Sequence, residues 1–284
     1  MVPLRGIHYR WVKPHITTIT SIFGSGQPIL NTYSAKQTTG ASLQRRARTQ
    51  KFTRAIDVVW VFNMLPSFGV PFFFKGKSTL DVGLVAYWPL NGNSNDVTGN
   101  GHNGTDTSAV YAAAKISQGL TTNGTGYSTY PAITLGANHA FSLSAWVYRT
   151  GGSSLLAIVG EQNTIGLFTN DAGGNRFMFT YGASQYHSDV SAWALNTWSH
   201  VVLTYDGVGG SLGKFRWYVN GGAAFIVNSA TSGVTWAPSR LGTAFFNTLT
   251  HRGAIDEIGL WNRQLTDAEA AQLYAGGAGK AYPF

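Results

Sequence analysis

The chain has 284 residues, of which 44% are hydrophobic and 13% aromatic, so it is long and apolar enough to bury a sizeable core. It contains no Cys, which excludes a disulfide framework, a thiolate metal site and a Cys nucleophile. With 35 Gly and only 11% charged residues, the composition favours an all-β protein with many turns.

The formal net charge of +8 is unevenly distributed along the chain. Residues 1–80 hold 11 of the 20 Lys and Arg residues and a single acid, Asp57, whereas residues 81–284 hold nine basic and 11 acidic residues. The basic character therefore belongs to residues 1–80 alone. We predict two parts: a basic N-terminal arm over 1–80 and a folded domain over 81–284.

The arm is rich in Ser, Thr, Gln and Gly between residues 24 and 53 and has no clear periodicity. This composition is typical of a solvated, extended segment. The alternative is an arm that docks on an anionic surface, which could be a neighbouring protein subunit, nucleic acid or lipid headgroups. The predicted contacts are basic side chains that crowd into ten residues: Arg45, Arg46, Arg48, Lys51 and Arg54.

The arm ends in an apolar segment, AIDVVWVFNMLPSFGVPFFF, over residues 55–74. Its length would span a bilayer as a helix. However, Pro66 and Pro71 would each interrupt a continuous helix. We therefore expect one or two buried strands over 58–62 and 70–74, with a membrane anchor or a secretory signal as the alternative.

Residues 84–104, LVAYWPLNGNSNDVTGNGHNG, predict a strand over 85–90 that is followed directly by a compact loop. The loop over 91–104 contains five Asn, four Gly and Asp96. These residues supply positive-φ positions and side chains that hydrogen-bond to their own backbone. They also present many oxygen atoms, which hard cations such as Ca²⁺ favour.

Strands follow at short intervals, separated by turns that contain Gly. In VVLTYDG, the alternation places Val201, Leu203 and Tyr205 on one face, as expected for a strand of two antiparallel sheets that pack face to face. The predicted strands cover residues 127–133, 141–149, 155–161, 165–170, 176–182, 198–206, 214–220, 223–229, 239–243 and 253–262.

One helix is predicted, near the C-terminus. Thr266 is a good N-cap, and Glu269 three residues later completes a capping box. Gly276 and Gly277 are expected to end the helix.

Four runs together resemble a known family. In chain order they are AYWPLNGNSNDVTGNGHNGT from Ala86, FSLSAWVY from Phe141, TWSHVVLTYDG from Thr197 with WYVNG from Trp217, and AIDEIGLWNRQLTDAEAAQLY from Ala254. They are similar to the laminin-G-like, concanavalin A-like jelly-roll domains of bacterial and phage surface proteins, over about residues 83–276. The resemblance implies an all-β fold: an antiparallel two-sheet jelly-roll β-sandwich with one short C-terminal helix, here preceded by the basic arm.

The same jelly roll is used by glycoside hydrolases, which need two carboxylates beside the scissile bond. In laminarinase-like relatives these are Glu, Asp and Glu at alternate positions of one strand. This sequence has three Glu, which are Glu161, Glu257 and Glu269, and none belongs to such a triplet. We therefore predict a protein without catalytic residues, and we interpret His200, which lies within a family motif, as structural.

Asp256 stands out in AIDEIGLWN. The alternation places it on the face of Ile258 and Leu260, which is expected to look into the core, near the Asn-rich loop. A buried carboxylate must be paired, hydrogen-bonded or metal-bound. Family members that bind calcium use loop oxygens, so one prediction is a structural Ca²⁺ held by Asp96, Asn100 and Asp256. The alternative is that Asp256 accepts hydrogen bonds from backbone N–H groups of that loop.

A glycan site needs an aromatic platform and a few fixed polar groups. Candidates outside the family motifs are Arg176, Tyr181, Tyr186, Trp193 and Trp236, with Asn175 and His187 nearby in the sequence. The alternative for each aromatic residue is a place in the core, because most aromatic residues of a sandwich are buried. The Trp residues inside the motifs, among them Trp198, are assigned to packing.

The functional prediction combines the arm with the resemblance. It is a non-enzymatic virion component, such as a phage capsid-decorating, fibre or tail protein. Its arm would bind other virion subunits within an oligomeric assembly, and its outward-facing jelly roll would bind a host-surface glycan. The alternatives are a secreted or membrane-anchored bacterial adhesin or carbohydrate-binding protein and, third, a glycoside hydrolase.

Overall fold

The computed structural model describes residues 78–152, 155–163, 165–172, 174–189 and 191–284. The predictions made for the arm, including Arg45, Arg46, Arg48, Lys51 and Arg54, and for the apolar segment 55–74 lie outside the described residues. No helix in the described part of the chain has the length and hydropathy of a membrane span.

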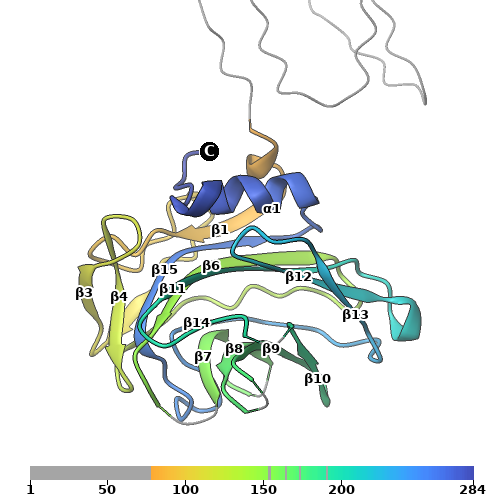
Figure 1. The fold of residues 1–284 in the computed structure, drawn as a ribbon, viewed down its shortest axis with the longest axis horizontal. Coiled ribbons are helices and arrows are strands. Elements are labelled where there is room, and N and C mark those ends of the chain that lie inside the picture. The colour runs from red at the N-terminus through yellow and green to blue at the C-terminus, as the bar shows by residue number, and fades with distance from the viewer. Residues whose placement is uncertain (1–77, 153–154, 164, 173, 190) are drawn as a thin grey trace, which may run out of the picture. The chain divides into compact units, whose positions relative to one another are not determined.

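Two antiparallel sheets form a sandwich, which confirms the predicted fold class (Figure 1). The eight-stranded sheet has the order β13-β12-β11-β6-β15-β4-β3, and β1 pairs with β15. Its strands are β1 (Leu84–Trp88), β3 (Val110–Ala113), β4 (Gln118–Asn123), β6 (Phe141–Arg149), β11 (Trp198–Tyr205), β12 (Lys214–Val219), β13 (Phe225–Asn228) and β15 (Arg252–Trp261).

The seven-stranded sheet has the order β10-β9-β8-β7-β14-β5-β2. Its strands are β2 (Thr105–Thr107), β5 (Tyr127–Thr129), β7 (Leu155–Gly160), β8 (Gly166–Asn170), β9 (Arg176–Tyr181), β10 (Ser184–His187) and β14 (Arg240–Leu241). Consecutive strands form hairpins at the edges of both sheets, as in β11-β12-β13 and β7-β8-β9-β10, whereas the central pairs, such as β6 with β15 and β7 with β14, join strands far apart in the sequence.

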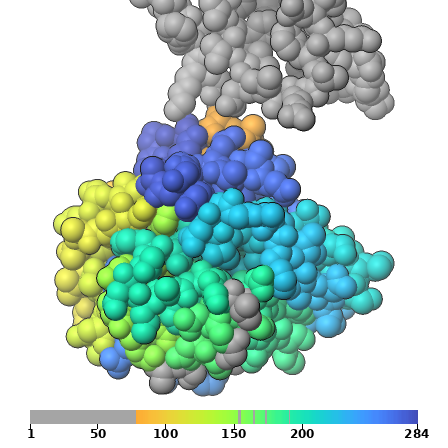
Figure 2. Space-filling model, in the orientation of Figure 1, coloured from red at the N-terminus to blue at the C-terminus, as the bar shows by residue number. Residues whose placement is uncertain are grey.

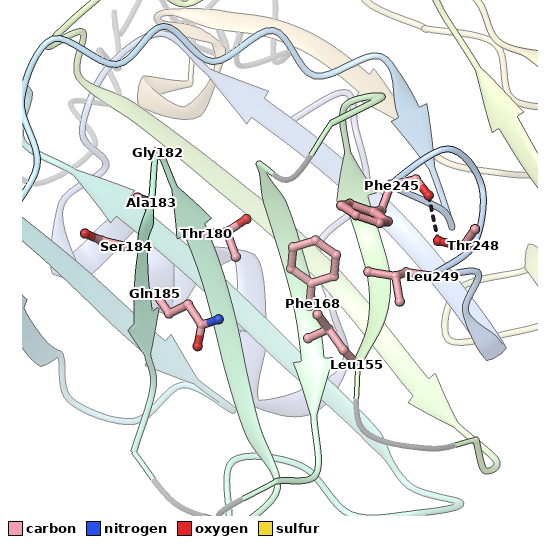
Figure 3. A pocket seen from close by; sticks show the side chains of 10 residues that line it. All are labelled: Leu155, Phe168, Thr180, Gly182, Ala183, Ser184, Gln185, Phe245, Thr248 and Leu249. Atoms are coloured by element: carbon pink, nitrogen blue, oxygen red, sulfur yellow. Dashed lines mark hydrogen bonds between the residues drawn. The ribbon is translucent and has the colours of Figure 1, made fainter.

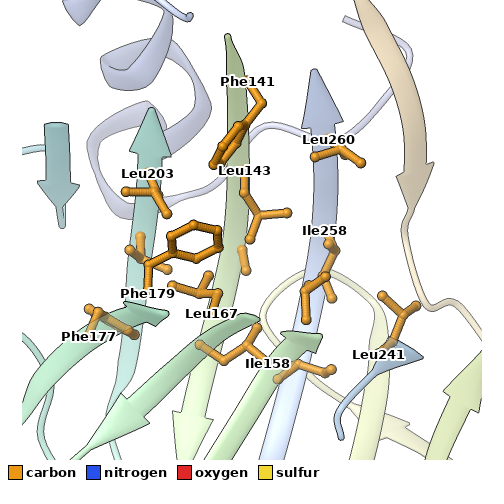
Figure 4. Close-up of a cluster of buried hydrophobic side chains, with 14 of the residues drawn as sticks. Phe141, Leu143, Ile158, Leu167, Phe177, Phe179, Leu203, Leu241, Ile258 and Leu260 are labelled. Carbon is orange, nitrogen blue, oxygen red and sulfur yellow. The ribbon is translucent and has the colours of Figure 1, made fainter. Parts of the chain in front are cut away.

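The core lies between the two sheets and follows from the alternation of side chains. In β6, Phe141, Leu143 and Val147 are buried and face the core, whereas Ser142 and the other even-numbered residues face the opposite side. Figure 4 shows inward-facing residues of both sheets meeting in one layer. Burial of these apolar side chains is the main stabilising contribution to the sandwich.

A second apolar layer covers part of the outer face of the eight-stranded sheet. Helix α1 (Asp267–Tyr274) and the C-terminal tail after it provide the cover, and Figure 2 shows their residues as a continuous dark-blue surface. The buried members of this layer are Leu80, Tyr87, Val202, Tyr218, Trp261, Leu265, Ala270, Leu273 and Phe284. This layer explains why strands β6 and β15 are buried on both faces.

A β-bulge in β15 overturns one prediction from the sequence. Asp256 pairs with Trp146, but the next pair on that face is Gly259 with Ser144, so β15 contains one extra residue. The bulge includes Glu257, whose backbone has a left-handed φ of +49°. The alternation therefore breaks, and Asp256 lies on the outer face with Trp146 instead of on the core face with Ile258.

Four observed strands were not predicted from the sequence: β2, β3, β4 and β10. These strands carry few large apolar residues: β2 is exposed throughout, and in β4 the core side chain is Leu120. Their place is determined by pairing with strands from elsewhere in the chain, such as β4 with β15. A local hydrophobic pattern cannot report such pairing.

The capping box of α1 gives the first testable prediction. Thr266 Oγ1 accepts a hydrogen bond from Glu269 N (3.3 Å), and Thr266 N donates to Glu269 Oε2 (2.9 Å). We expect Thr266→Ala to lower the free energy of unfolding by about 1 kcal/mol, because the N-terminal N–H of the helix loses its acceptor. Chemical denaturation measures the change. Thr266→Ser keeps the hydroxyl and should be near neutral, and equal losses in both variants would contradict the capping role.

Candidate functional site

The outer face of the seven-stranded sheet carries an apolar pocket. Alternation along β8 and β9 turns Leu167 and Phe179 into the core and leaves Phe168 and Met178 on the outer face. Leu155 and Leu249 pack against these outer residues. The pocket has a volume of about 520 Å³ and is lined by Leu155, Phe168, Thr180, Gly182, Ala183, Ser184, Gln185, Phe245, Thr248 and Leu249.

The close-up view shows how the pocket is arranged (Figure 3). The buried ring of Phe168 lies between Gln185 on one side and Phe245 on the other. Gln185 is exposed, and Phe245 is 42% exposed. The pocket therefore combines an apolar floor with an aromatic ring and an amide at its rim.

The loop that carries Phe245 has an unusual backbone. Phe245, Phe246 and Asn247 have φ values of +50°, +54° and +62°. The left-handed conformation costs about 1–2 kcal/mol for each residue other than Gly. Hydrogen bonds hold it in place: Phe245 N donates to Asn163 O (3.2 Å), and Phe246 N donates to Gln162 O (2.9 Å). The result is an ordered loop that keeps two phenyl rings at the surface.

Two basic side chains lie on the same outer face beside the pocket. Arg176 alternates with the inward-facing Phe177, and His187 pairs with Met178 across β9 and β10. Arg176 Nε and His187 Nδ1 are buried, and neither has a hydrogen-bond partner among the described residues. Burial, and then the nearby charge of Arg176, lower the pKa of His187, so its ring is neutral near pH 7.

The other predicted ligand-binding residues are in the core. Tyr181, Tyr186, Trp193 and Trp236 are between 1% and 5% exposed. Their burial follows from the sandwich: Tyr181 alternates inward in β9, and the Trp193 ring packs over the Arg149 guanidinium, 4.5 Å from the ring centroid. These four side chains therefore do not form an exposed platform, and the expectation for them is corrected.

Three residues of the pocket are not predicted from the sequence: Phe168, Gln185 and Phe245. The alternation in GLFTN could have separated Phe168 from Leu167, but it does not tell which face is covered. Nothing in the sequence marks Phe245 as exposed, because its orientation depends on the left-handed loop.

Asp256 and Glu257 form a buried pair of carboxylates under the C-terminal tail. Asp256 is 0% exposed, and it accepts hydrogen bonds from Ile116 N (2.8 Å) and Glu257 N (2.9 Å). Glu257 Oε2 accepts a hydrogen bond from the Tyr87 hydroxyl. Burial raises the pKa of Asp256 to about 8, with the charge of Glu257 adding to the effect, and burial raises the pKa of Glu257 to about 7.

Asp96 is the centre of the Asn-rich loop. Its Oδ1 accepts hydrogen bonds from Tyr87 N (3.1 Å), Thr98 N (3.0 Å) and Thr98 Oγ1 (2.7 Å), and its Oδ2 accepts one from His102 N (3.2 Å). The carboxylate thus accepts hydrogen bonds from backbone N–H groups that have no strand partner in this loop.

In this structure the predicted calcium ligands make hydrogen bonds to the backbone, and the calcium site stays a prediction. The carboxylates of Asp96 and Asp256 already accept hydrogen bonds from backbone N–H groups, and Asn100 Nδ2 donates to Val85 O (2.8 Å). Asp256 accepts from Ile116 and Glu257, not from the loop that contains Asp96. Among the described residues, no three His, Cys, Asp or Glu side chains gather as metal ligands. Each acid stabilises its own segment of backbone.

Comparison with known families agrees with this fold. The laminin G family described as the concanavalin A-like lectin/glucanases superfamily matches residues 122–271, more than half of the chain. The chain belongs to this superfamily. No curated protein is significantly similar to it in sequence.

Solved structures with the same fold include three from different contexts. Domain 4 of AbnA, an extracellular arabinanase from Geobacillus stearothermophilus in complex with arabinotriose, is 20% identical with a TM-score of 0.55, over 66% of this chain and 97% of that one. The binding domain of Paraclostridial Mosquitocidal Protein 1 is 14% identical (TM-score 0.54; 69% and 52%). Trypanosoma rangeli sialidase in complex with the inhibitor DANA is 20% identical (TM-score 0.50; 76% and 36%). At these identities the likeness concerns the fold alone.

The buried carboxylates predict a pH-dependent stability. Both pKa values are raised above the ordinary 3.8 and 4.5, so between those values and pH 7–8 the folded chain binds more protons than the unfolded chain. Stability is therefore lost as the pH rises through this range. Buried His200 and His251 have lowered pKa values of about 3 and 4 and act in the opposite direction, but only below about pH 6.5.

We expect the free energy of unfolding to fall between about pH 6.5 and 8, and the slope to flatten in Asp256→Asn. Urea denaturation across this pH range measures it. Asp206→Asn is the control, because Asp206 is a partly exposed acid at another place in the fold. A slope that is unchanged in Asp256→Asn would contradict the assignment.

The loop around Asp96 predicts a stabilisation that does not depend on metal. We expect Asp96→Ala to lower the free energy of unfolding by about 2 kcal/mol or more, because backbone donors lose a charged acceptor. The loss should be the same in calcium and in a chelator. Calorimetric melting in both conditions tests this, with Asn95→Ala as an exposed control in the same loop. A midpoint that rises with calcium in the natural protein, but not in Asp96→Ala, would support the metal hypothesis.

Proposed function

We propose that the chain is a non-enzymatic carbohydrate-binding protein whose site is the pocket on the outer face of the seven-stranded sheet. The observation that carries this proposal is the ordered presentation of Phe245 beside the buried Phe168 ring and the exposed Gln185 amide. A sugar ring has an apolar face that packs on an aromatic ring, and hydroxyl groups that hydrogen-bond to an amide at its edge. The pocket volume of about 520 Å³ lies within the range of small-ligand sites.

The concanavalin A-like lectin fold supports the ligand class. Among the structural relatives, the arabinanase domain is in complex with arabinotriose, and this chain spans 97% of that domain. That relative is itself one domain of an enzyme, so a binding role separate from catalysis is compatible with this fold.

The absence of catalysis is part of the proposal. Glu257 is 3% exposed under the C-terminal tail, and Glu269, in the first turn of α1, forms a salt bridge with Arg263 (2.7 Å). Glu161 accepts a hydrogen bond from Ala237 N (3.3 Å). None of the three lines the pocket, so a pair of carboxylates flanking a bound sugar is not expected there.

The place of the protein in a virion is a separate proposal that depends on the basic arm. The arm, and the alternatives of secretion or a membrane anchor through residues 55–74, lie outside the described residues. Binding of other virion subunits by the arm therefore stays a prediction from the charge distribution.

The glycan site is tested with the full-length protein on an array of neutral and sialylated oligosaccharides that includes arabinotriose. We expect binding to at least one of them, and an affinity about 3–10-fold lower in Phe245→Ala, the loss of one aromatic contact. Phe225→Ala is the matched control, because Phe225 is 41% exposed on β13 of the other sheet. The absence of binding across the array, or equal losses in both variants, would contradict the proposal.

A further inference from the structure

A second hollow lies on the opposite sheet. It has a volume of about 540 Å³ on the outer face of the eight-stranded sheet, where β3, β4, β15, β6 and β11 lie side by side. Its lining residues are Ala112, Ala113, Thr121, Thr122, Asn123, Tyr148, Thr150, Trp198, Gly253 and Ala254. We call it the Tyr148–Trp198 groove.

The groove begins where the helical cover ends. On the outer face of β6, Trp146 is covered: Tyr274 of α1 stacks on it with ring centroids 5.7 Å apart, and the Lys115 ammonium lies 4.3 Å from a Trp146 ring centroid. Tyr148 is the next residue on that face and is only partly buried. The same surface that α1 covers on one side is therefore open at Tyr148.

Two aromatic rings line this open part of the face. Tyr148 and Trp198 are paired across β6 and β11, with ring centroids 5.4 Å apart at an angle of 48°. Both residues are partly exposed, and neither the Tyr148 hydroxyl nor the Trp198 indole N–H has a hydrogen-bond partner among the described residues. The sequence motif predicts a packing role for Trp198, but in the structure this residue is partly exposed and lines the groove.

The floor next to these rings is made of small residues. Gly253 has φ +133°, and a Cβ atom there would lie 1.9 Å from Tyr148 O. Only Gly allows this close approach of β15 to β6. Ala254, opposite Tyr148 in the sheet, adds only a methyl group, so the floor stays low beside the aromatic pair.

The remaining lining groups are neutral and polar. Thr121, Asn123 and Thr150 present two hydroxyls and an amide, and Asn123 Oδ1 already accepts a hydrogen bond from Thr125 Oγ1 (2.8 Å), which leaves its Nδ2 as a donor. No Lys, Arg, Asp or Glu lines the groove. The exposed Arg252 pairs with Asn123 across β15 and β4 but does not line the groove. Along the lining itself, a neutral, polyhydroxylated ligand would find matching donors and acceptors.

We propose that the Tyr148–Trp198 groove is a second carbohydrate site, which takes a neutral oligosaccharide. One sugar ring packs on the tilted aromatic pair, and its hydroxyls hydrogen-bond with Thr121, Asn123 and Thr150. An aromatic groove can also receive a proline-rich peptide. The hydroxyl and amide side chains around the two aromatic rings favour a sugar over a peptide, because they can hydrogen-bond to hydroxyls on more than one edge of the sugar ring.

The site adds a property that the first pocket cannot supply. The two hollows lie on the outer faces of different sheets, so the whole sandwich separates them. One protein molecule then binds two chains, or two segments of one chain, of a polysaccharide. Binding to a multivalent surface gains avidity even when each site alone is weak.

The test uses the full-length Phe245→Ala protein, so that the pocket on the other sheet contributes little. Isothermal titration calorimetry is carried out with arabinohexaose, xylohexaose and cellohexaose, with sialyllactose as the charged comparison and decaproline as the peptide comparison. We expect one of the neutral hexasaccharides to bind at one site per molecule, with weaker binding of sialyllactose and decaproline.

Two further variants locate the site. Trp198→Ala removes one ring of the pair, and Thr121→Lys places a long charged side chain over the groove at a partly exposed position. Each should lower the affinity for the neutral hexasaccharide at least about tenfold, which corresponds to about 1.4 kcal/mol. Because Thr121→Lys removes no buried side chain, it keeps the test valid if Trp198→Ala fails to fold.

The outcomes separate this inference from the proposed function. Loss of binding in Phe245→Ala alone, with no effect of Trp198→Ala or Thr121→Lys, overturns the second site and leaves the first. Loss in the groove variants, with no effect of Phe245→Ala on any ligand, supports the second site and contradicts the first. The inference is overturned if no hexasaccharide binds at concentrations up to about 10 mM. It is also overturned if decaproline binds and Thr121→Lys abolishes that binding.

Discussion

The pairing of β6 with β15 at the centre of the eight-stranded sheet is the constraint on which the rest of the fold depends. It joins residues 141–149 to residues 252–261, more than 100 positions away in the sequence. On one face, Leu143 and Leu260 lie side by side and pack into the core against the other sheet. On the opposite face, Trp146 and Trp261 receive α1 and the C-terminal tail. Both apolar layers of the domain therefore meet on these two strands.

The bulge at Glu257 allows β15 to pack against apolar layers on both faces although it contains two acids, Asp256 and Glu257. With regular alternation, Asp256 and Glu257 would point to opposite faces, and Asp256 would enter the core between the sheets. The extra residue instead places Asp256 on the outer face, where Ile116 N and Glu257 N satisfy it, and brings Glu257 to the Tyr87 hydroxyl. An unpaired acid in the core would cost several kcal/mol, so the bulge resolves a conflict between the sequence and the sheet.

The two hollows have a common structural origin, although they lie on different sheets. Each forms where an aromatic side chain on an outer face is left without full cover: Phe245 at the end of a left-handed loop, and Tyr148 with Trp198 beyond the reach of α1. They differ in their chemistry. The pocket at Phe168 is mainly apolar, whereas the Tyr148–Trp198 groove is surrounded by hydroxyls and an amide. The two proposed sites therefore offer different chemistry to a ligand.

The sequence by itself determined the sandwich, its family and the capping box at Thr266, because period-two alternation and local turn and cap residues are properties of short segments. Only the tertiary structure decided which aromatic residues reach solvent. Tyr181 and Trp236 are aromatic residues outside the family motifs and were therefore candidates for a binding platform, yet they are core residues. Phe245 and Trp198, in contrast, keep exposed surface. Exposure depends on which face of a strand another element covers, and on bulges such as the one at Glu257 that reverse the alternation. Both are set by contacts between segments far apart in the chain, which no local pattern contains.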